Sequence, residues 1–181
     1  MERDRLRMNA AEALARIGDS HGADALAAMA SSENFYEVLE AGRRLVQLGD
    51  PRGFEAIHQQ TRAGDDTPFA FLSRLYAAME LTRLGDPRGP DILARLLENG
   101  GALSGEDALV PEVVQVEAAE LLARHGDARG ADMLAAIAAS EAAHRDSRIK
   151  AVDLLVRLED PRGAGLRRKL RRPRGRRRRQ D

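Results

Sequence analysis

Apolar residues recur along the chain with the spacing of amphipathic helices, and the recurrence is arranged around five aspartates. The residue nine positions before each of these anchor aspartates is Ala, and the residue five positions before is Leu. The residue two positions before is apolar except at His125. These three positions share one face at 3.6 residues per turn, so an amphipathic helix is predicted to precede each anchor. The anchors are Asp19, Asp50, Asp86, Asp127 and Asp160.

The residues around each anchor predict a tight turn into a second helix. Gly precedes four of the five anchors, where it can take the left-handed conformation at a helix end, and the anchor can then cap the next helix. Pro51, Pro87 and Pro161 follow their anchors at the first helical position, where a missing N–H costs nothing. One helical pair cannot bury its apolar faces alone. The sequence therefore predicts an all-α fold, an α-solenoid of about five stacked helix-turn-helix repeats.

The anchor spacings of 31, 36, 41 and 33 residues set the domain organisation, since the repeat length varies while the turn does not. Arrays of constant length, such as ankyrin or tetratricopeptide repeats, fit this pattern poorly. We expect one repeat domain over residues 1–172, followed by an Arg-rich tail over 173–181. The connector over 99–110 is the longest, and a functional role for it stays open. The predicted repeats cover residues 2–32, 33–66, 67–110, 111–142 and 143–172.

The shared pattern is R-x-x-A-A-x-x-L-x-x-L-G-D-x-R. It resembles the short HEAT-like repeats first associated with phycobilisome lyases, over about residues 3–172. Arg7, Arg74 and Arg148 stand at the leading arginine of the pattern, whereas Val38 and Gln115 depart from it. The resemblance implies a HEAT-like repeat architecture. It leaves function open, because scaffolds, regulatory subunits and a few enzymes use such repeats.

Composition supports helices and excludes several classes of protein. Aromatic residues make up 3% of the chain, and there is neither Trp nor Cys, which disfavours an all-β fold, disulfides and thiolate chemistry. The chain starts with charged residues, and no stretch of 18 apolar residues occurs, so we expect no signal peptide, no membrane span and a cytoplasmic location. Abundant Ala and the excess of Arg over Lys are typical of a GC-rich bacterial genome.

The net charge of zero hides two blocks of opposite sign. Residues 167–181 contain ten basic residues and one acidic residue, which leaves 19 basic and 28 acidic residues in 1–166. An arginine run of this kind is expected to be flexible. Three partners are open for it: the phosphates of a polyanion, an acidic protein, or the acidic body of its own chain. The candidate polyanion-binding residues are Arg171, Arg172, Arg174, Arg176, Arg177, Arg178 and Arg179.

The sequence predicts no catalytic, cofactor or metal site. The four histidines fall in different repeats and form no metal-binding motif, and no nucleophile, phosphate-loop or dinucleotide motif is present. Because the pairing of anchor and basic residue recurs, we interpret it as turn structure, in which Asp caps a helix and Arg reaches carbonyls or a neighbouring unit's Asp. The predicted turn residues are Asp19, Asp50, Arg52, Asp86, Arg88, Asp127, Arg129, Asp160 and Arg162.

A protein-binding site is predicted where the second helices of repeats two and three depart from the others. Positions eight and nine past the anchor, which we expect on the concave face, are mostly small, but His58, Gln59 and Arg95 are polar. All six aromatic residues lie within residues 35–76, so rings could create an interface beside these polar groups or could simply fill the core. The predicted partner-binding residues are Phe54, His58, Gln59, Arg62 and Arg95.

Three functions remain open from the sequence. The favoured one is a non-enzymatic protein-interaction scaffold or adaptor that binds a partner on the concave face. A lyase-like or isomerase-like enzyme subunit of the HEAT-repeat kind is the first alternative. A nucleic-acid or ribosome-associated protein that acts through the Arg-rich tail is the second.

Overall fold

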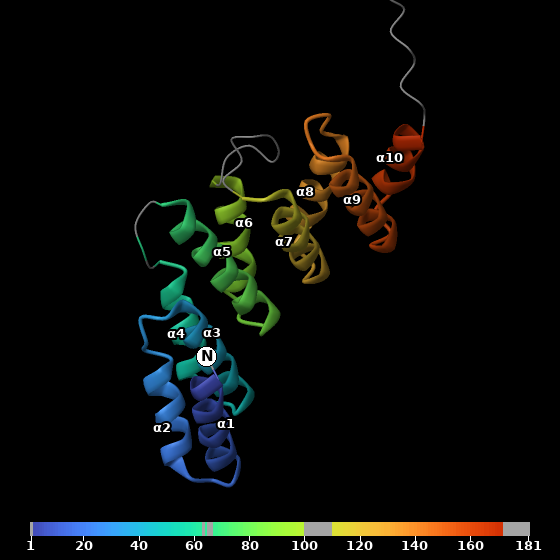
Figure 1. The fold of residues 1–181 in the computed structure, drawn as a ribbon. Helices are drawn as coiled ribbons and strands as arrows, with labels where there is room; N and C mark the ends of the chain where they lie inside the picture. The colour runs from blue at the N-terminus through green and yellow to red at the C-terminus, as the bar shows by residue number, and fades with distance from the viewer. Residues whose placement is uncertain (1, 63, 65–66, 100–109, 172–181) are drawn as a thin grey trace, which may run out of the picture. The chain divides into compact units, whose positions relative to one another are not determined.

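The described part of the chain is built from helices in consecutive pairs. A computed structural model describes residues 2–62, 64, 67–99 and 110–171 (Figure 1). Within these ranges the chain forms ten helices and no strand. The predicted all-α, solenoid-type fold of helix-turn-helix repeats is confirmed.

The chain divides into two compact units, Met1–Asn99 and Gly100–Asp181. The division falls at the connector that is longest in the sequence, and each predicted repeat range contains one helical pair. The first unit contains α1 (Glu2–Arg16), α2 (Ser20–Met29), α3 (Phe35–Gln47), α4 (Arg52–Gln60), α5 (Pro68–Arg83) and α6 (Gly89–Asn99). The second contains α7 (Glu112–Arg124), α8 (Ala128–Ala139), α9 (Arg145–Arg157) and α10 (Arg162–Arg171).

The turn within each pair lies at an anchor aspartate, as predicted. Gly49 shows how the first helix ends: its φ is +78°, and the N–H of Asp50 donates to the carbonyl of Leu45 at 2.9 Å. This geometry satisfies a carbonyl that would otherwise lack a partner at the helix end. Glu159 occupies the equivalent position of the fifth turn with a φ of +57°, a conformation that a residue with a Cβ adopts at a cost.

A second glycine, three positions past each anchor, brings the two helices of a pair close together. A Cβ built on Gly53 would collide with the carbonyl oxygen of Gly42 and would lie 2.8 Å from the Cβ of Leu45. The start of α4 therefore packs directly on the backbone of α3. The same close approach occurs at Gly22, Gly89 and Gly130.

The core lies between successive repeats. Ala41 and Leu45 of α3 are fully buried in one cluster with Met8, Leu26 and Met29 of the preceding pair. In the next repeat the equivalent Ala77 and Leu81 are fully buried as well. The Ala and Leu positions thus pack on the repeat that precedes them.

The first repeat departs from the prediction that this stripe is buried. Leu6 is 63% exposed, Leu14 40% and Ile17 80%, although Leu14 occupies the same repeat position as Leu45. The physical reason is that the stripe packs on a preceding repeat, and no described part of the chain lies on this face of α1.

Candidate functional site

The recurring anchor and arginine form a closed hydrogen-bonded turn. In the second turn the Oδ1 atom of Asp50 accepts the backbone N–H of Arg52, the first residue of α4, at 3.0 Å. The guanidinium of Arg52 folds back on the same carboxylate, with Nε 3.0 Å from Oδ1 and Nη2 2.6 Å from Oδ2. The same set of bonds joins Asp86 to Arg88, Asp127 to Arg129 and Asp160 to Arg162.

The remaining guanidinium nitrogen links one repeat to the one before it. The Nη1 atom of Arg52 donates to Asp24 at 2.8 Å, and that of Arg162 donates to Asp132 at 2.6 Å. Arg88 reaches Glu55 in the same way at 3.4 Å. At these three junctions the acidic residue five positions past one anchor accepts from the arginine of the next turn, and we call these sets of Asp, Arg and acid the turn ladder.

These contacts fix the charge states of the ladder. The Arg88 guanidinium lowers the pKa of Asp86 below its ordinary value, and Arg52 lowers the pKa of Asp50 in the same way. The carboxylates in turn raise the pKa of Arg52 and of Arg162. Each anchor carboxylate is thus an ionised acceptor engaged by its own turn, and the interpretation of these residues as turn structure agrees with the geometry.

The first turn carries a weaker version of the same arrangement. His21 stands where the later turns have arginine, and its Nδ1 lies 2.8 Å from Oδ1 of Asp19. The Asp19 carboxylate raises the pKa of His21 above its ordinary value. His21 is exposed, so solvent screens this pair.

The histidines do not converge on a metal site within the described residues. No group of three or more His, Asp and Glu side chains there could hold a metal ion. His58 lies beside the third turn, with Nδ1 3.2 Å from Nη1 of Arg88, and His125 Nδ1 lies 2.9 Å from the carbonyl oxygen of Leu121. Each of these two histidines thus contacts a group of its own part of the fold, Arg88 for His58 and the α7 backbone for His125.

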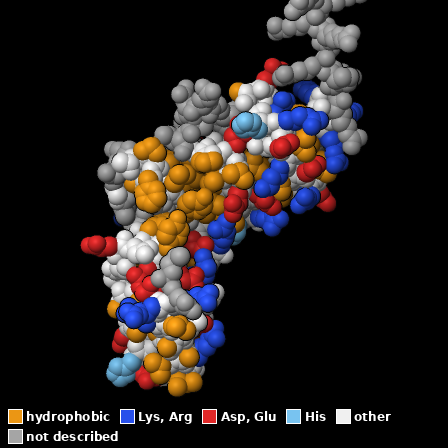
Figure 2. Space-filling view, viewed as in Figure 1, with side chains coloured by type: hydrophobic (Ala, Val, Ile, Leu, Met, Phe, Trp, Pro, Cys, Tyr) orange, Lys and Arg blue, Asp and Glu red, His pale blue; other side chains and the backbone are white. Residues whose placement is uncertain are grey.

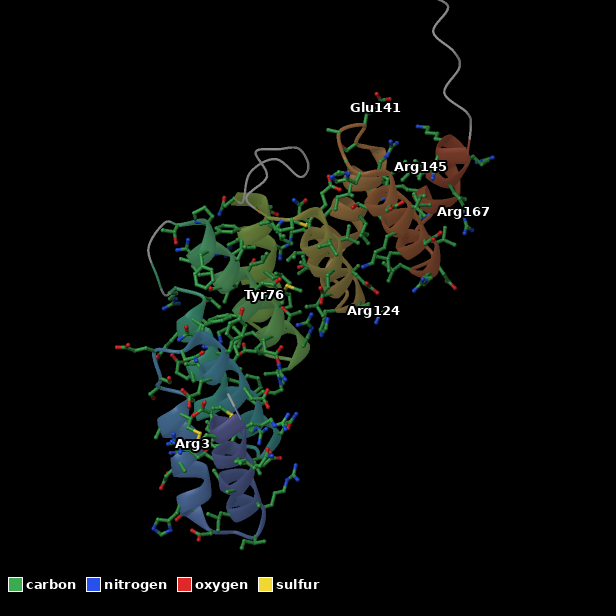
Figure 3. The ribbon with its side chains drawn as sticks, viewed as in Figure 1. Arg3, Tyr76, Arg124, Glu141, Arg145 and Arg167 are labelled. Atoms are coloured by element: carbon green, nitrogen blue, oxygen red, sulfur yellow. The ribbon has the colours of Figure 1, made fainter. Side chains whose placement is uncertain are left out.

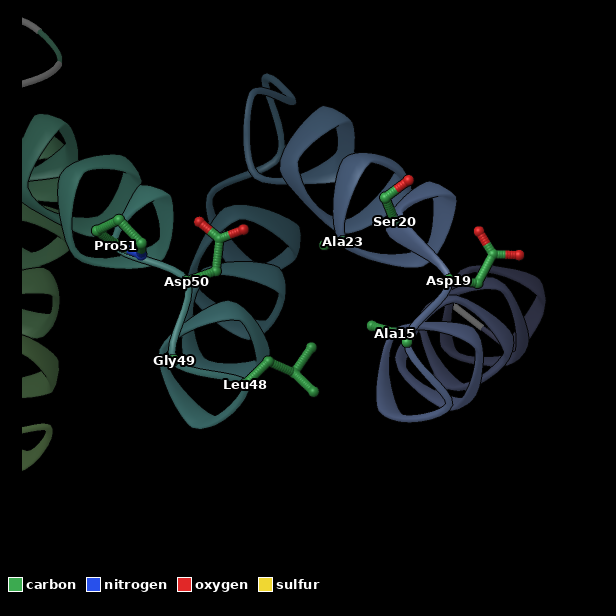
Figure 4. A pocket seen from close by; sticks show the side chains of 9 residues that line it. Ala15, Asp19, Ser20, Ala23, Leu48, Gly49, Asp50 and Pro51 are labelled. Carbon is green, nitrogen blue, oxygen red and sulfur yellow. The ribbon is translucent and has the colours of Figure 1, made fainter.

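Two of the surface hollows are products of the repeat. One, of about 400 Å³, lies between the first and second turns and is lined by Ala15, Ala23, Leu48 and the turn residues (Figure 4). The equivalent positions of the fourth and fifth turns line a second hollow of about 170 Å³ in the second unit. Since the same repeat positions line both, their shape follows from turn geometry and points to no particular ligand.

The predicted partner-binding residues do not all face solvent. Gln59, Arg62 and Arg95 are exposed, and the Arg95 Nη2 atom lies 2.6 Å from Oδ2 of Asp91 one turn earlier. His58 is only 7% exposed, and Phe54 is partly buried against Ile57 and Leu81. We expected the residues eight and nine positions past each anchor to face solvent. The residues nine positions past the anchor do so. Position eight faces the neighbouring helix, so His58 does not decorate an exposed surface.

Three aromatic rings are exposed, but on the first helices of their repeats. Tyr36 on α3 is 74% exposed, while Phe69 and Tyr76 on α5 are 70% and 40% exposed. Phe69, the partly buried Leu72 and Tyr76 are spaced three and four residues apart, which places them on one side of α5. Hydrophobic side chains gather over α5 in the space-filling view (Figure 2). We call Tyr36, Phe69, Leu72 and Tyr76 the aromatic surface.

An ion-pair cluster borders the aromatic surface where α3 meets α5. The Nε atom of Arg43 donates to Glu80 at 2.6 Å, and its Nη1 atom donates to Glu40 at 3.1 Å. Tyr36 and Tyr76 lie one helical turn before Glu40 and Glu80 respectively. Because residues four apart lie above one another on a helix, both rings stand on the same side of the α3 and α5 contact. Tyr76 is labelled in the side-chain view (Figure 3).

Sequence reasoning missed this placement, although it had singled out all six rings. The signal was available in the spacing, because Phe69, Leu72 and Tyr76 follow the helical period on the side of α5 away from Leu75 and Ala78. The Arg-rich tail cannot be compared in this way, because residues 172–181 and the side chain of Arg171 lie outside the described part of the chain.

Comparison with known proteins bears on the repeats. A family model described as the PBS lyase HEAT-like repeat matches residues 6–32, which contain most of α1 and all of α2. No curated protein matches the sequence significantly. The match covers one repeat, and the anchor, Ala and Leu positions of that repeat recur in the other four. Among the described residues, none of the helices combines the length and apolar character needed to cross a membrane.

Proposed function

We propose that this chain, whose residues 6–32 match a HEAT-like repeat model, is a non-enzymatic, cytoplasmic scaffold that binds a partner protein through the aromatic surface of α3 and α5. The observation that carries the proposal is the exposure of Tyr36, Phe69 and Tyr76, at 74%, 70% and 40%. Half of the aromatic residues of a chain that has only six are thus left in solvent on two neighbouring helices.

Rings of this kind supply most of the binding energy at protein interfaces. An aromatic side chain removes a large apolar area from water and loses little conformational freedom when it binds. The Arg43, Glu40 and Glu80 cluster would supply the polar border that interfaces place around such a centre. Gln59 and Arg95 lie on the second helices α4 and α6, and Arg62 lies just after the end of α4, so these residues form a separate candidate surface.

Site-specific photo-crosslinking distinguishes the two surfaces. A photoreactive phenylalanine analogue would replace Tyr76 in one full-length variant and Arg95 in another, and crosslinked proteins would be identified from native cells. We expect one partner to crosslink from position 76 and not from position 95. Crosslinking of that partner mainly from position 95 would move the site to the second helices.

A quantitative binding measurement with the identified partner then tests the rings. Replacing Tyr36 and Phe69 together with Ala should weaken binding at least about tenfold, the effect of losing about 1.4 kcal/mol. Val113→Ala is the matched control, because Val113 is 60% exposed on α7 of the other unit. Unchanged affinity of the double variant would contradict the proposal.

The arginine run of the sequence supports a second candidate function, contact with a nucleic acid or another polyanion. A full-length variant would carry Gln in place of five arginines, namely Arg174, Arg176, Arg177, Arg178 and Arg179. This variant should not bind a short RNA or heparin at low salt. Wild-type affinity should fall steeply with salt, because phosphate neutralisation releases counterions. Equal binding by both chains would exclude the tail as the contact.

A further inference from the structure

The exposed side of α1 carries the apolar positions that the first helices of other repeats use to pack on a predecessor. It presents Leu6, Ala10, Leu14 and Ile17 in one stripe, with Arg7 beside it, and all five are exposed. Arg7 occupies the leading arginine position of the repeat, and Ala10, Leu14 and Ile17 occupy the three apolar positions. We call these five residues the entry face.

Interior repeats reveal what such a face fits. Ala41, Leu45 and Leu48 pack against the preceding pair of helices, in the cluster that includes Met8 and Met29. The leading arginine of the fifth repeat, Arg148, donates from Nε to the carbonyl oxygen of Ala138 at 3.2 Å, in the last turn of α8. An entry face therefore fits the outer side of a helical pair together with the carbonyl end of its second helix.

The α9 and α10 pair presents an open side of this kind. A groove of about 390 Å³ runs between the two helices and is lined by Ile149, Val152, Leu170, Asp153, Arg145 and Arg167. Arg145 and Arg167 are labelled on these helices in Figure 3.

The apolar lining of this groove corresponds to the repeat positions that receive an entry face. By distance from the anchor, Ile149, Val152 and Leu170 match Met8, Ala11 and Met29 of the first repeat. The groove, which we call the exit groove, is thus the receiving half of the same interface.

We propose that the entry face of one copy of this protein docks into the exit groove of a second copy. The contact repeats, between molecules, the packing that joins α3 to the α1 and α2 pair within one chain. Leu14 and Ile17 would enter the groove, and Arg7 would donate to the carbonyl end of the second copy's α10, as Arg148 does to α8. This self-association goes beyond the proposed scaffold function and is independent of it.

The residues at the two ends determine how strong this contact is and which faces pair. The turn ladder cannot continue across it, because Gly165 stands where other repeats have an acid and His21 where they have arginine. The contact therefore lacks an ion pair found between repeats and should be weak. Pairing two entry faces would bring Arg3 and Arg7 of both copies together. The exit groove also holds two arginines, Arg145 and Arg167, but Arg167 is paired with Asp153 at 3.1 Å. Head-to-tail packing is favoured because the exit groove presents the repeat positions that receive an entry face, and such a contact leaves one face of each kind free to join further copies.

Two full-length variants, each blocked at one end, test the proposal. Leu14→Glu places a charge on the entry face, and Leu170→Glu places one in the exit groove. Analytical ultracentrifugation over a concentration series should show the mean mass of the wild type rising past that of a dimer. Each variant alone should stay monomeric, with its dissociation constant raised at least about tenfold. An equimolar mixture should form a 1:1 dimer and nothing larger, because one intact face of each kind remains.

Val113→Glu is the control, since it adds the same charge to an exposed residue outside both faces and should associate like the wild type. Circular dichroism and thermal melting would confirm that each variant is folded. A wild type that stays monomeric up to about millimolar concentration would overturn the proposal. Continued association of either single variant, or a mixture that fails to dimerise, would also overturn it. Association abolished by Leu14→Glu alone would assign the contact to two entry faces and would equally overturn it.

Discussion

The first and third repeats carry the same pattern in opposite surroundings. Leu81 of the third repeat is completely buried, whereas Leu14, at the same position of the first, is 40% exposed. Leu84 is partly buried, but its counterpart Ile17 is 80% exposed. The repeat pattern therefore specifies which side of a helix is able to pack. Whether that side is buried depends on the repeat before it.

The largest expected effect is a difference in the free energy of unfolding between alanine variants of these two leucines. Leu81→Ala should lower the free energy of unfolding by roughly 2–5 kcal/mol, because it leaves a cavity among fully buried neighbours. Leu14→Ala should cost less, about 1 kcal/mol, since Leu14 is already 40% exposed to water. Chemical denaturation of both variants checks this. Equal losses would contradict the assignment of the repeat positions.

A second pair of variants compares a crowded glycine with an open one. Gly130→Ala should destabilise by about 1–3 kcal/mol, because a Cβ there meets the carbonyl oxygen of Ala119 and the N atom of Ala123. Gly165→Ala should stabilise by up to about 1 kcal/mol, because nothing lies within 4 Å of its Cβ and Ala favours helix. Thermal melting should therefore shift in opposite directions for the two variants.

The residue that precedes each anchor gives a third comparison, between Glu159 and Gly126. Glu159→Gly should stabilise the protein by about 1 kcal/mol, because Glu159 holds a φ of +57° that glycine adopts without strain. Gly126→Ala should destabilise by a similar amount, since its φ is +80°. Urea unfolding at neutral pH provides the test, and a loss of stability in Glu159→Gly would contradict it.

The smallest expected effects are changes in the pH dependence of stability, which differ between the third turn and the first. Because Arg88 lowers the pKa of Asp86 in the folded chain, the stabilisation is present above the unfolded pKa of about 3.9 and is lost as pH falls. The melting temperature of Asp86→Asn should therefore be lower than that of the wild type at pH 7, and the difference should narrow toward pH 3.

The pair of Asp19 and His21 gives the opposite pH dependence of stability. Asp19 raises the pKa of His21, so its stabilisation is present below the unfolded pKa of about 6.5 and is lost as pH rises through the raised value. His21→Gln should lower the melting temperature slightly at pH 5.5 and leave it unchanged at pH 8.5. A larger effect at pH 8.5 would contradict this assignment.

The sequence predicted the parts of the fold that depend on local chemistry. Gly49, Asp50 and Pro51 specify a helix end, a cap and a helix start within three residues, so the turns lie where the sequence places them. Burial was less predictable, because it depends on neighbours distant in the sequence. His58 and Gln59 are adjacent in the sequence, yet the first is buried beside Arg88 and the second is exposed.

The ladder was only partly visible in the sequence. The recurrence of Asp and Arg predicted that Arg reaches either carbonyls or a neighbouring unit's Asp, but it did not predict which carboxylate accepts. The pairing of Arg52 with Asp24 depends on how one repeat is rotated against the next, which a single sequence does not encode locally. The aromatic surface was missed for a different reason, since the helical spacing of Phe69, Leu72 and Tyr76 was present in the sequence but was not used.

The turns and the connectors between repeats lie at opposite ends of the helices, because the two helices of each pair run antiparallel. Spacing differences of up to ten residues between anchors are absorbed at the connector end, while each turn keeps its bonds. The second repeat carries both a donor for its predecessor, Arg52, and an acceptor for its successor, Glu55. Gene duplication could therefore insert or delete whole repeats, or lengthen a connector, without redesigning the junctions, and evolutionary novelty in such a chain would accumulate along one edge.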